Sequence, residues 1–225
     1  MVRFLVFLVF LFQLTIGFGQ GLLFHLGSGN QKITPDTTEC LSVSGQKWKF
    51  SQASFYLSDF VWEGKDGKSI PQTGRVELMH LGMENRNQLI PAPQNVGRVC
   101  FRFGLDSTTQ VSGRTDGALD PANGMYWAWN TGYIQCRLEG FSPDSKGKKG
   151  KFEFHLGGYA QPFPTDTKVC LELPGNALQQ EILMDLMEFM NAVDLKKNWT
   201  ILTPGREAHR LSMILGKSFR VSVQK

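Results

Sequence analysis

The chain has 225 residues, of which 41% are hydrophobic and 20% charged, and its formal net charge is +4 at pH 7. So mild a charge excludes the dense basic face that nucleic-acid binding requires. The one basic run, residues 146–151, is interrupted by glycines and is typical of an exposed hairpin tip.

The first 19 residues have the pattern of a secretory signal peptide. A basic start at Arg3 is followed by an apolar run over residues 4–16 and by small residues just before Gln20. This run is too short for a membrane span and is typical of a cleaved leader. We therefore expect an exported protein, periplasmic or extracellular, whose residues 20–225 form a single domain.

Between residues 22 and 173 the apolar residues alternate with polar ones, with Gly, Pro and Asn turns between the runs. Short alternating segments at near-regular spacing are typical of an all-β antiparallel sandwich or barrel. The expected strands lie within residues 22–29, 47–62, 75–83, 95–105, 125–140, 151–159 and 167–174, and residues 47–62 are expected to hold two short strands. A long polar loop covers 106–124.

The pattern changes after Pro174. Apolar residues at helical spacing predict a helix over residues 176–196, with Asn176 as its N-cap. Its methionines, Met184, Met187 and Met190, fit core packing better than a copper-gathering surface. The tail, residues 203–225, is expected to add a short helix and a last strand.

Four cysteines, Cys40, Cys100, Cys136 and Cys170, allow up to two disulfides in three pairings. Alternation puts Cys100 and Cys170 each opposite the apolar side of its strand, so this pair could meet on one side of a sheet. None of the cysteines has the CxxC spacing of a zinc or redox motif.

Three of the four histidines precede Leu-Gly near an expected strand end: His25, His80 and His155. Three strand ends can converge at one rim of a sandwich, where three imidazoles would suit copper or zinc. His209 has no such setting and is expected on the surface of the C-terminal segment. The segment MYWAWN puts Met125, Trp127 and Trp129 on one strand face, where at least one tryptophan is expected to plug the core beneath the long loop.

Four blocks of the sequence together resemble the MbnP-like family of periplasmic proteins associated with the copper-chelating peptide methanobactin. The blocks match in order and spacing over about residues 22–173. They are FYLSDF (55–60), RFGLDS (102–107), GALDPANGMYWAWNTGYIQCRLEG (117–140) and FEFHLGGY (152–159).

The resemblance implies a β-sandwich that binds copper, Cu(I) or Cu(II), through histidines and is not itself an enzyme. His155 would be the firmest ligand, joined by His25 and His80. It also implies a partner, a MauG-like di-haem cytochrome c peroxidase, that oxidises Trp127 or Trp129 to kynurenine close to the metal, with Met125 nearby. A TonB-type outer-membrane copper transporter is a further expected partner.

Two other functions stay open on the sequence alone. One is an interaction module that is either metal-free or stabilised by calcium. In the calcium-stabilised form, the ion would be held in the long loop by Asp106, Asp116 and Asp120. Turn formation explains aspartates in such positions equally well. A copper oxygenase is disfavoured, because signal cleavage would leave His25 several residues inside the chain instead of at its amino terminus.

Overall fold

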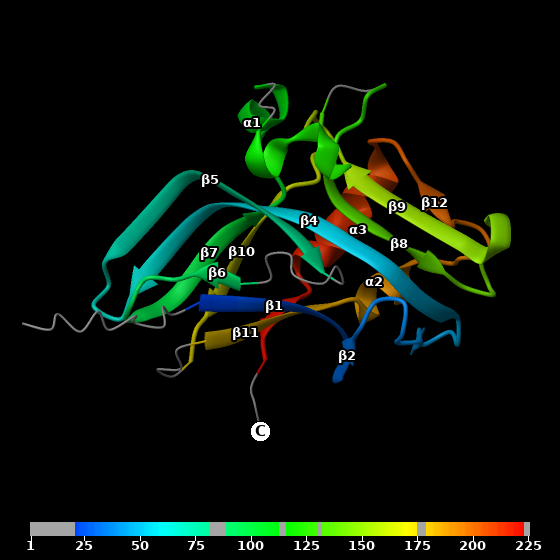
Figure 1. The fold of residues 1–225 in the computed structure, drawn as a ribbon, viewed down its shortest axis with the longest axis horizontal. Helices are drawn as coiled ribbons and strands as arrows, with labels where there is room; N and C mark the ends of the chain where they lie inside the picture. Colours follow the sequence, from blue (N-terminus) through cyan, green and yellow to red (C-terminus); the bar gives the residue numbers. More distant parts are fainter. Residues whose placement is uncertain (1–20, 82–88, 113–115, 130–131, 175–178, 223–225) are drawn as a thin grey trace, which may run out of the picture.

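The computed structural model describes residues 21–81, 89–112, 116–129, 132–174 and 179–222. Strands dominate these residues, as the alternation predicts, and they form two curled sheets (Figure 1). No helix among them is long and apolar enough to cross a membrane. The predicted signal peptide, residues 1–19, lies outside the described residues.

The smaller sheet is built around β1, which pairs with β11 on one edge and with β2 and β6 on the other. The β1–β11 pair is parallel, so this sheet is mixed instead of purely antiparallel. Its strands are β1 (Gly21–Ser28), β2 (Gln31–Ile33), β6 (Leu89–Pro91), β11 (Gln179–Asp185) and β13 (Phe219–Val221).

The larger sheet is organised by one long strand, β4, that arches across the molecule (Figure 1). It runs as one strand where the sequence indicated two stretches, and it bends at Asp59, whose φ is 51° and where the register shifts. The strands are β3 (Cys40–Leu41), β4 (Lys47–Gly64), β5 (Ser69–Leu81), β7 (Val96–Phe103), β8 (Ile134–Phe141), β9 (Lys151–Gly157), β10 (Thr167–Glu172) and β12 (Thr200–Ile201).

The core lies between the two sheets and is rich in aromatic rings. Phe24 of β1 contacts Phe101 of β7 edge-on at 6.1 Å between centroids, and Trp48 of β4 contacts Phe152 of β9 at 4.9 Å. All four side chains are buried. The larger sheet therefore has an inner face that meets β1 and β11 and an outer face that points away from them.

The predicted helix over residues 176–196 is wrong in its first half. Residues 179–185 form β11, and only Met187–Ala192 are helical, as α2. Ile182 and Leu186 are four residues apart, a spacing that also places them on one side of a strand, so the pattern fits both structures. Pairing with β1 and β13 favours the strand. Asn176, the predicted cap, lies outside the described residues.

The remaining helices flank the larger sheet. The C-terminal helix α3 (Arg206–Gly216) precedes β13, which confirms the expectation for the tail. The long loop between β7 and β8 sits above β4 in Figure 1, on the side away from β1 and β11. The loop carries α1 (Ser107–Val111), η1 (Gly117–Leu119) and η2 (Pro121–Asn123), whereas η3 (Lys148–Gly150) forms the β8–β9 hairpin tip.

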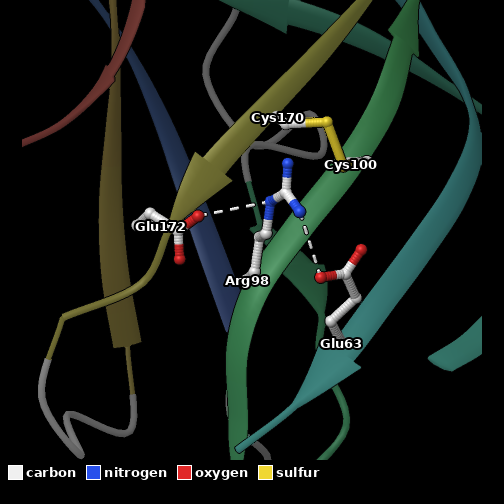
Figure 2. Close-up of a disulfide and its surroundings, with 5 residues drawn as sticks. All are labelled: Glu63, Arg98, Cys100, Cys170 and Glu172. Atoms are coloured by element: carbon white, nitrogen blue, oxygen red, sulfur yellow. Dashed lines mark hydrogen bonds and ion pairs between the residues drawn. A yellow bond between two sulfur atoms is a disulfide. The ribbon is translucent and has the colours of Figure 1, made fainter. Parts of the chain in front are cut away.

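A disulfide joins β7 and β10, which confirms the pairing of Cys100 with Cys170. The two residues lie directly opposite each other in the antiparallel register. Two positions along the same strands, Arg98 forms ion pairs with Glu63 of β4 at 3.2 Å and with Glu172 of β10 at 3.3 Å (Figure 2). These contacts tie three adjacent strands together.

The other two cysteines, Cys40 and Cys136, are buried free thiols. Met184 and Met190 are also fully buried in the core, and the partly buried Met187 packs against it, in agreement with the expectation that the three methionines serve packing. Because the two cysteines, Met184 and Met190 are buried, none of these four side chains is available at the surface to react or to bind a metal.

Candidate metal centre

Strand alternation decides the direction of the two histidines on the larger sheet. On β9 and β5 the neighbours of His155 and His80 point into the core, so both imidazoles belong to the outer face. The buried inward neighbours are Phe154 and Leu156 on β9, and Met79 and Leu81 on β5.

The strand register places these two histidines at the ends of one row across four strands. His80 is opposite Ser54, Ser54 is opposite Arg137, and Arg137 is opposite His155. Residues directly opposite in an antiparallel pair share a face. Three strand spacings, roughly 14 Å, separate the two histidine backbones, so they share a surface but not a common contact. His80 is buried and pairs through Nδ1 with Ser54 Oγ at 2.9 Å.

His155 lies in a compact polar cluster centred on Glu139. Its Nε2 is 2.7 Å from Glu139 Oε1, Arg137 Nε donates to the same oxygen at 2.6 Å, and Lys151 Nζ is 3.3 Å from Oε2. Lys151 also donates to Glu153 at 2.7 Å. Burial alone would raise the pKa of Glu139, but the hydrogen bonds from His155 and Arg137 outweigh it and lower that pKa to about 2. Glu139 is therefore a carboxylate at neutral pH.

This cluster has the donor atoms of a metal site. Ligand atoms of Glu139, Glu153 and His155 all lie within 4.8 Å of one another, the one such group of three among the described residues. One imidazole with carboxylates suits Cu(II) or zinc better than the softer Cu(I). Arg137 and Lys151 already balance the two carboxylates, so a cation that enters the cluster has to displace them.

His25 is in a different sheet from the other two candidate histidines. On β1 its neighbours Phe24 and Leu26 face the core, and His25 faces the opposite side of the smaller sheet. Its Nε2 is 3.7 Å from Glu181 Oε2 of β11. Burial, together with nearby Lys32, lowers the pKa of His25. The expected convergence of the three histidines at one rim is thus wrong. All three point away from the core, but His25 is on the smaller sheet, whereas His80 and His155 are on the larger one.

The two tryptophans have opposite environments. Trp127 is 5% exposed, whereas Trp129 is 63% exposed, and their ring centroids are 5.7 Å apart. The benzo ring of Trp127 lies against Gly157 of β9, where the Cβ atom of any larger residue would be 2.7 Å from Cη2 of that ring. Because Gly157 is two residues beyond His155 on the same strand, Trp127 covers the outer face next to the polar cluster.

Trp127 belongs to a second hydrophobic cluster between the long loop and the outer face. The segment from Met125 to Trp129 is irregular, with one bridge from Tyr126 to Tyr133, so strand alternation does not apply to it. Met125 is fully buried, as is expected for a core plug. The members of this cluster are Tyr56, Leu78, Leu105, Leu119, Met125, Trp127, Tyr133 and Ile134.

The loop aspartates serve local structure. Asp106 caps α1 by accepting from Thr109 N at 2.9 Å, and Asp120 accepts from Ala122 N at 2.8 Å in η2. Asp116 directly precedes η1. None of the three belongs to the three-ligand group found among the described residues, which favours the turn-forming interpretation over calcium.

Two placements differ from what the sequence indicated. His209 is partly buried on α3, where Nδ1 hydrogen-bonds Pro164 O and the ring packs near Phe163, so it is not a free surface residue. Glu139 is absent from the ligands that the sequence predicts, although it alternates with the apolar Leu138 and so has to share the outer face with Arg137 and His155. That alternation is the signal that could have found it.

Known proteins resemble this chain in sequence and in fold. A family model described as MbnP matches residues 17–208. Among solved structures, MbnP from Methylosinus trichosporium is similar, with a TM-score of 0.60 and 16% sequence identity over 79% of this chain and 78% of that chain. At this identity the likeness shows the fold alone. No curated protein matches the chain significantly.

Proposed function

The chain belongs to the MbnP family, and on this premise we propose that it is an exported protein that binds copper on the outer face of the larger sheet. His155 is the central ligand, Glu153 supplies a carboxylate oxygen, and Glu139 orients the imidazole of His155. His80 is at the far end of the same row, and His25 is outside this site. No catalytic activity is proposed.

The observation that carries this proposal is the contact between His155 and the buried carboxylate of Glu139 at 2.7 Å. A carboxylate on one ring nitrogen orients a histidine and raises its basicity as a metal ligand. With Nε2 engaged in this way, Nδ1 is the nitrogen through which His155 would bind copper. Copper supplies one redox-active centre with affinity for imidazole and carboxylate; the protein supplies the ligands and their orientation.

The tryptophan pair supports a proposed oxidation by a MauG-like di-haem cytochrome c peroxidase. Trp129 is exposed and offers a point of contact, and its ring is 5.7 Å from that of Trp127, next to β9. In this proposal Trp127 is converted to kynurenine in two steps. Two equivalents of hydrogen peroxide, reduced to water at the peroxidase, add one oxygen atom each to C2 and C3 as the C2–C3 bond breaks, which gives N-formylkynurenine. Water then hydrolyses the formyl group, so that C2 leaves as formate and the ring nitrogen becomes an aryl amine. The aryl amine and new carbonyl would then lie beside the copper ligands. A TonB-type outer-membrane transporter is a second proposed partner, on family membership alone.

A copper titration against a competing chelator tests the ligand assignment. We expect the mature chain to bind one equivalent of Cu(II), the variant His155→Ala to lose this binding, and Glu139→Gln to weaken it about tenfold or more. His25→Ala is the matched control and keeps the parent affinity, because His25 lies on the other sheet. Mass spectrometry of the peptide containing residues 125–130, from the native host, tests whether Trp127 is oxidised.

Two results would contradict the proposal. Loss of copper in His25→Ala but not in His155→Ala would move the site to the smaller sheet. Absence of copper binding by protein from the native host would leave the Glu139 cluster as an ion-pair network in a metal-free module, and calcium titrations of thermal stability would then test the remaining alternative.

A further inference from the structure

A cavity of about 290 Å³ lies beside the long loop, apart from the polar cluster of Glu139. Its walls come from α1, from the segment that follows Trp127, from the residues after β9 and from those before α3. Aromatic rings form much of the lining. The lining residues used below are Gln110, Trp127, Tyr133, Tyr159, Ala160 and Phe163.

Two buried hydrogen-bond donors in this lining have no partner within the described residues. Gln110 is 1% exposed; its Oε1 accepts from Tyr133 N at 2.6 Å, which leaves its Nε2 unpaired. The indole Nε1 of Trp127 is also buried and unpaired. Leaving a buried donor unsatisfied costs about 1–3 kcal/mol, so two such donors on residues that line the same cavity indicate a place for an acceptor.

The backbone around the cavity is built from glycines with positive φ angles. Gly132 has φ of 141° and Gly158 has φ of 125°, a region that side-chain-bearing residues rarely adopt. A Cβ on Gly158 would be 3.0 Å from Pro204, and one on Gly132 would be 3.2 Å from Gln110 Oε1. The two glycines thus keep space along the cavity wall, Gly132 next to the side-chain amide of Gln110.

The lining contains no charged side chain among the described residues. A carboxylate in this cavity would be partly desolvated without a countercharge, which is costly, whereas a neutral carbonyl oxygen requires only hydrogen-bond donors. Flat aromatic walls suit a flat apolar body.

We propose that the cavity binds a small organic molecule with a flat apolar body and an amide or ketone carbonyl, whose oxygen accepts hydrogen bonds from Gln110 Nε2 and Trp127 Nε1. This binding goes beyond the proposed copper function and requires no metal. It concerns the protein with unmodified Trp127, as made in a host that lacks the partner peroxidase.

The test is a ¹⁵N NMR titration of the metal-free mature chain with three probes: benzamide, benzoate and toluene. We expect benzamide to give saturable shifts of the Trp127 indole N–H and the Gln110 side-chain amide. Benzoate and toluene, which lack respectively the neutral carbonyl and any acceptor, bind about tenfold more weakly or not at all.

Three variants locate the site. Trp127→Phe keeps an aromatic ring without the donor and weakens benzamide binding about tenfold. Ala160 is an exposed residue of the lining, so Ala160→Trp places a large side chain in the cavity while both donors stay in the chain, and it abolishes binding. Trp129→Phe is the control and leaves the affinity unchanged, because Trp129 is not in the lining. Circular dichroism checks that each variant folds.

Several outcomes would overturn the proposal. One is the absence of saturable shifts with benzamide, which would mean that water alone satisfies the two donors. Toluene binding as tightly as benzamide would show a merely apolar cavity. Unchanged benzamide affinity in both Trp127→Phe and Ala160→Trp would place the ligand elsewhere.

Discussion

Replacing Glu139 with glutamine should make the free energy of unfolding depend less on pH between neutral and acid conditions. Glu139 is 6% exposed and accepts from His155 and Arg137. Burial opposes its ionisation, but these partners lower its pKa from the ordinary 4.5 to about 2 in the folded state. A carboxyl whose folded pKa is depressed stabilises the protein above its unfolded pKa, and this contribution is lost as the pH falls from about 4.5 to about 2.

The size of the effect follows from the difference of roughly 2.5 pKa units between the two states. At about 1.4 kcal/mol per unit, the ionised Glu139 contributes about 3 kcal/mol at neutral pH, as an order of magnitude. Glu139→Gln keeps the shape and one acceptor but removes the charge. We therefore expect the variant to be about 2–3 kcal/mol less stable than the parent at pH 7, and this difference to shrink to about 1 kcal/mol at pH 3.

Urea unfolding in chelator-treated buffer, at pH 7, 5, 4 and 3, measures the difference between parent and variant. Other carboxyls titrate in both proteins and cancel in this difference. Glu172→Gln is the control: Glu172 pairs with Arg98, but its side chain is 80% exposed, so its effect should stay below about 1 kcal/mol at every pH. A Glu139→Gln difference that is the same at pH 7 and pH 3 would refute the reasoning.

Three further predictions concern the covalent and packed parts of the fold. Replacing Cys100 and Cys170 with serine should lower the free energy of unfolding by about 4 kcal/mol, since the bond closes a long loop. The same free energy of unfolding in urea for the parent with and without reductant would contradict this. Trp127→Ala should cost about 3–5 kcal/mol and Trp129→Ala less than about 0.5 kcal/mol, as measured by urea unfolding; similar losses in both would be inconsistent with the burial difference. Gly157→Ala should cost about 1–3 kcal/mol, because its Cβ would be 2.7 Å from both Trp127 and a backbone oxygen, and an unchanged melting temperature would count against that contact.

Local pattern predicts which way a side chain points, and it does so well here. Alternation turned Cys100 and Cys170 each away from the apolar side of its own strand, and it turned His155 away from Phe154. It cannot tell which sheet a strand joins. His25 and His155 both face outward, yet the strands that carry them are in different sheets, so the expected three-histidine rim does not form.

The misassigned helix has a related cause. The spacing of Ile182 and Leu186 is compatible with a helix and with a strand, and only the partner strands β1 and β13 decide between them. Glu139 could have been found from the alternation of β8. Its partners could not, because the contacts with His155 and Lys151 depend on the register of β8 against β9.

The disulfide between Cys100 and Cys170 encloses a particular stretch of chain. Trp127, Glu139 and His155 all lie between the two cysteines in the sequence, and so does the whole loop on the outer face. A protease that cuts this loop once would open the ring without releasing a fragment. The nicked protein would keep its mass apart from one added water, and only reduction would separate the two pieces on a gel.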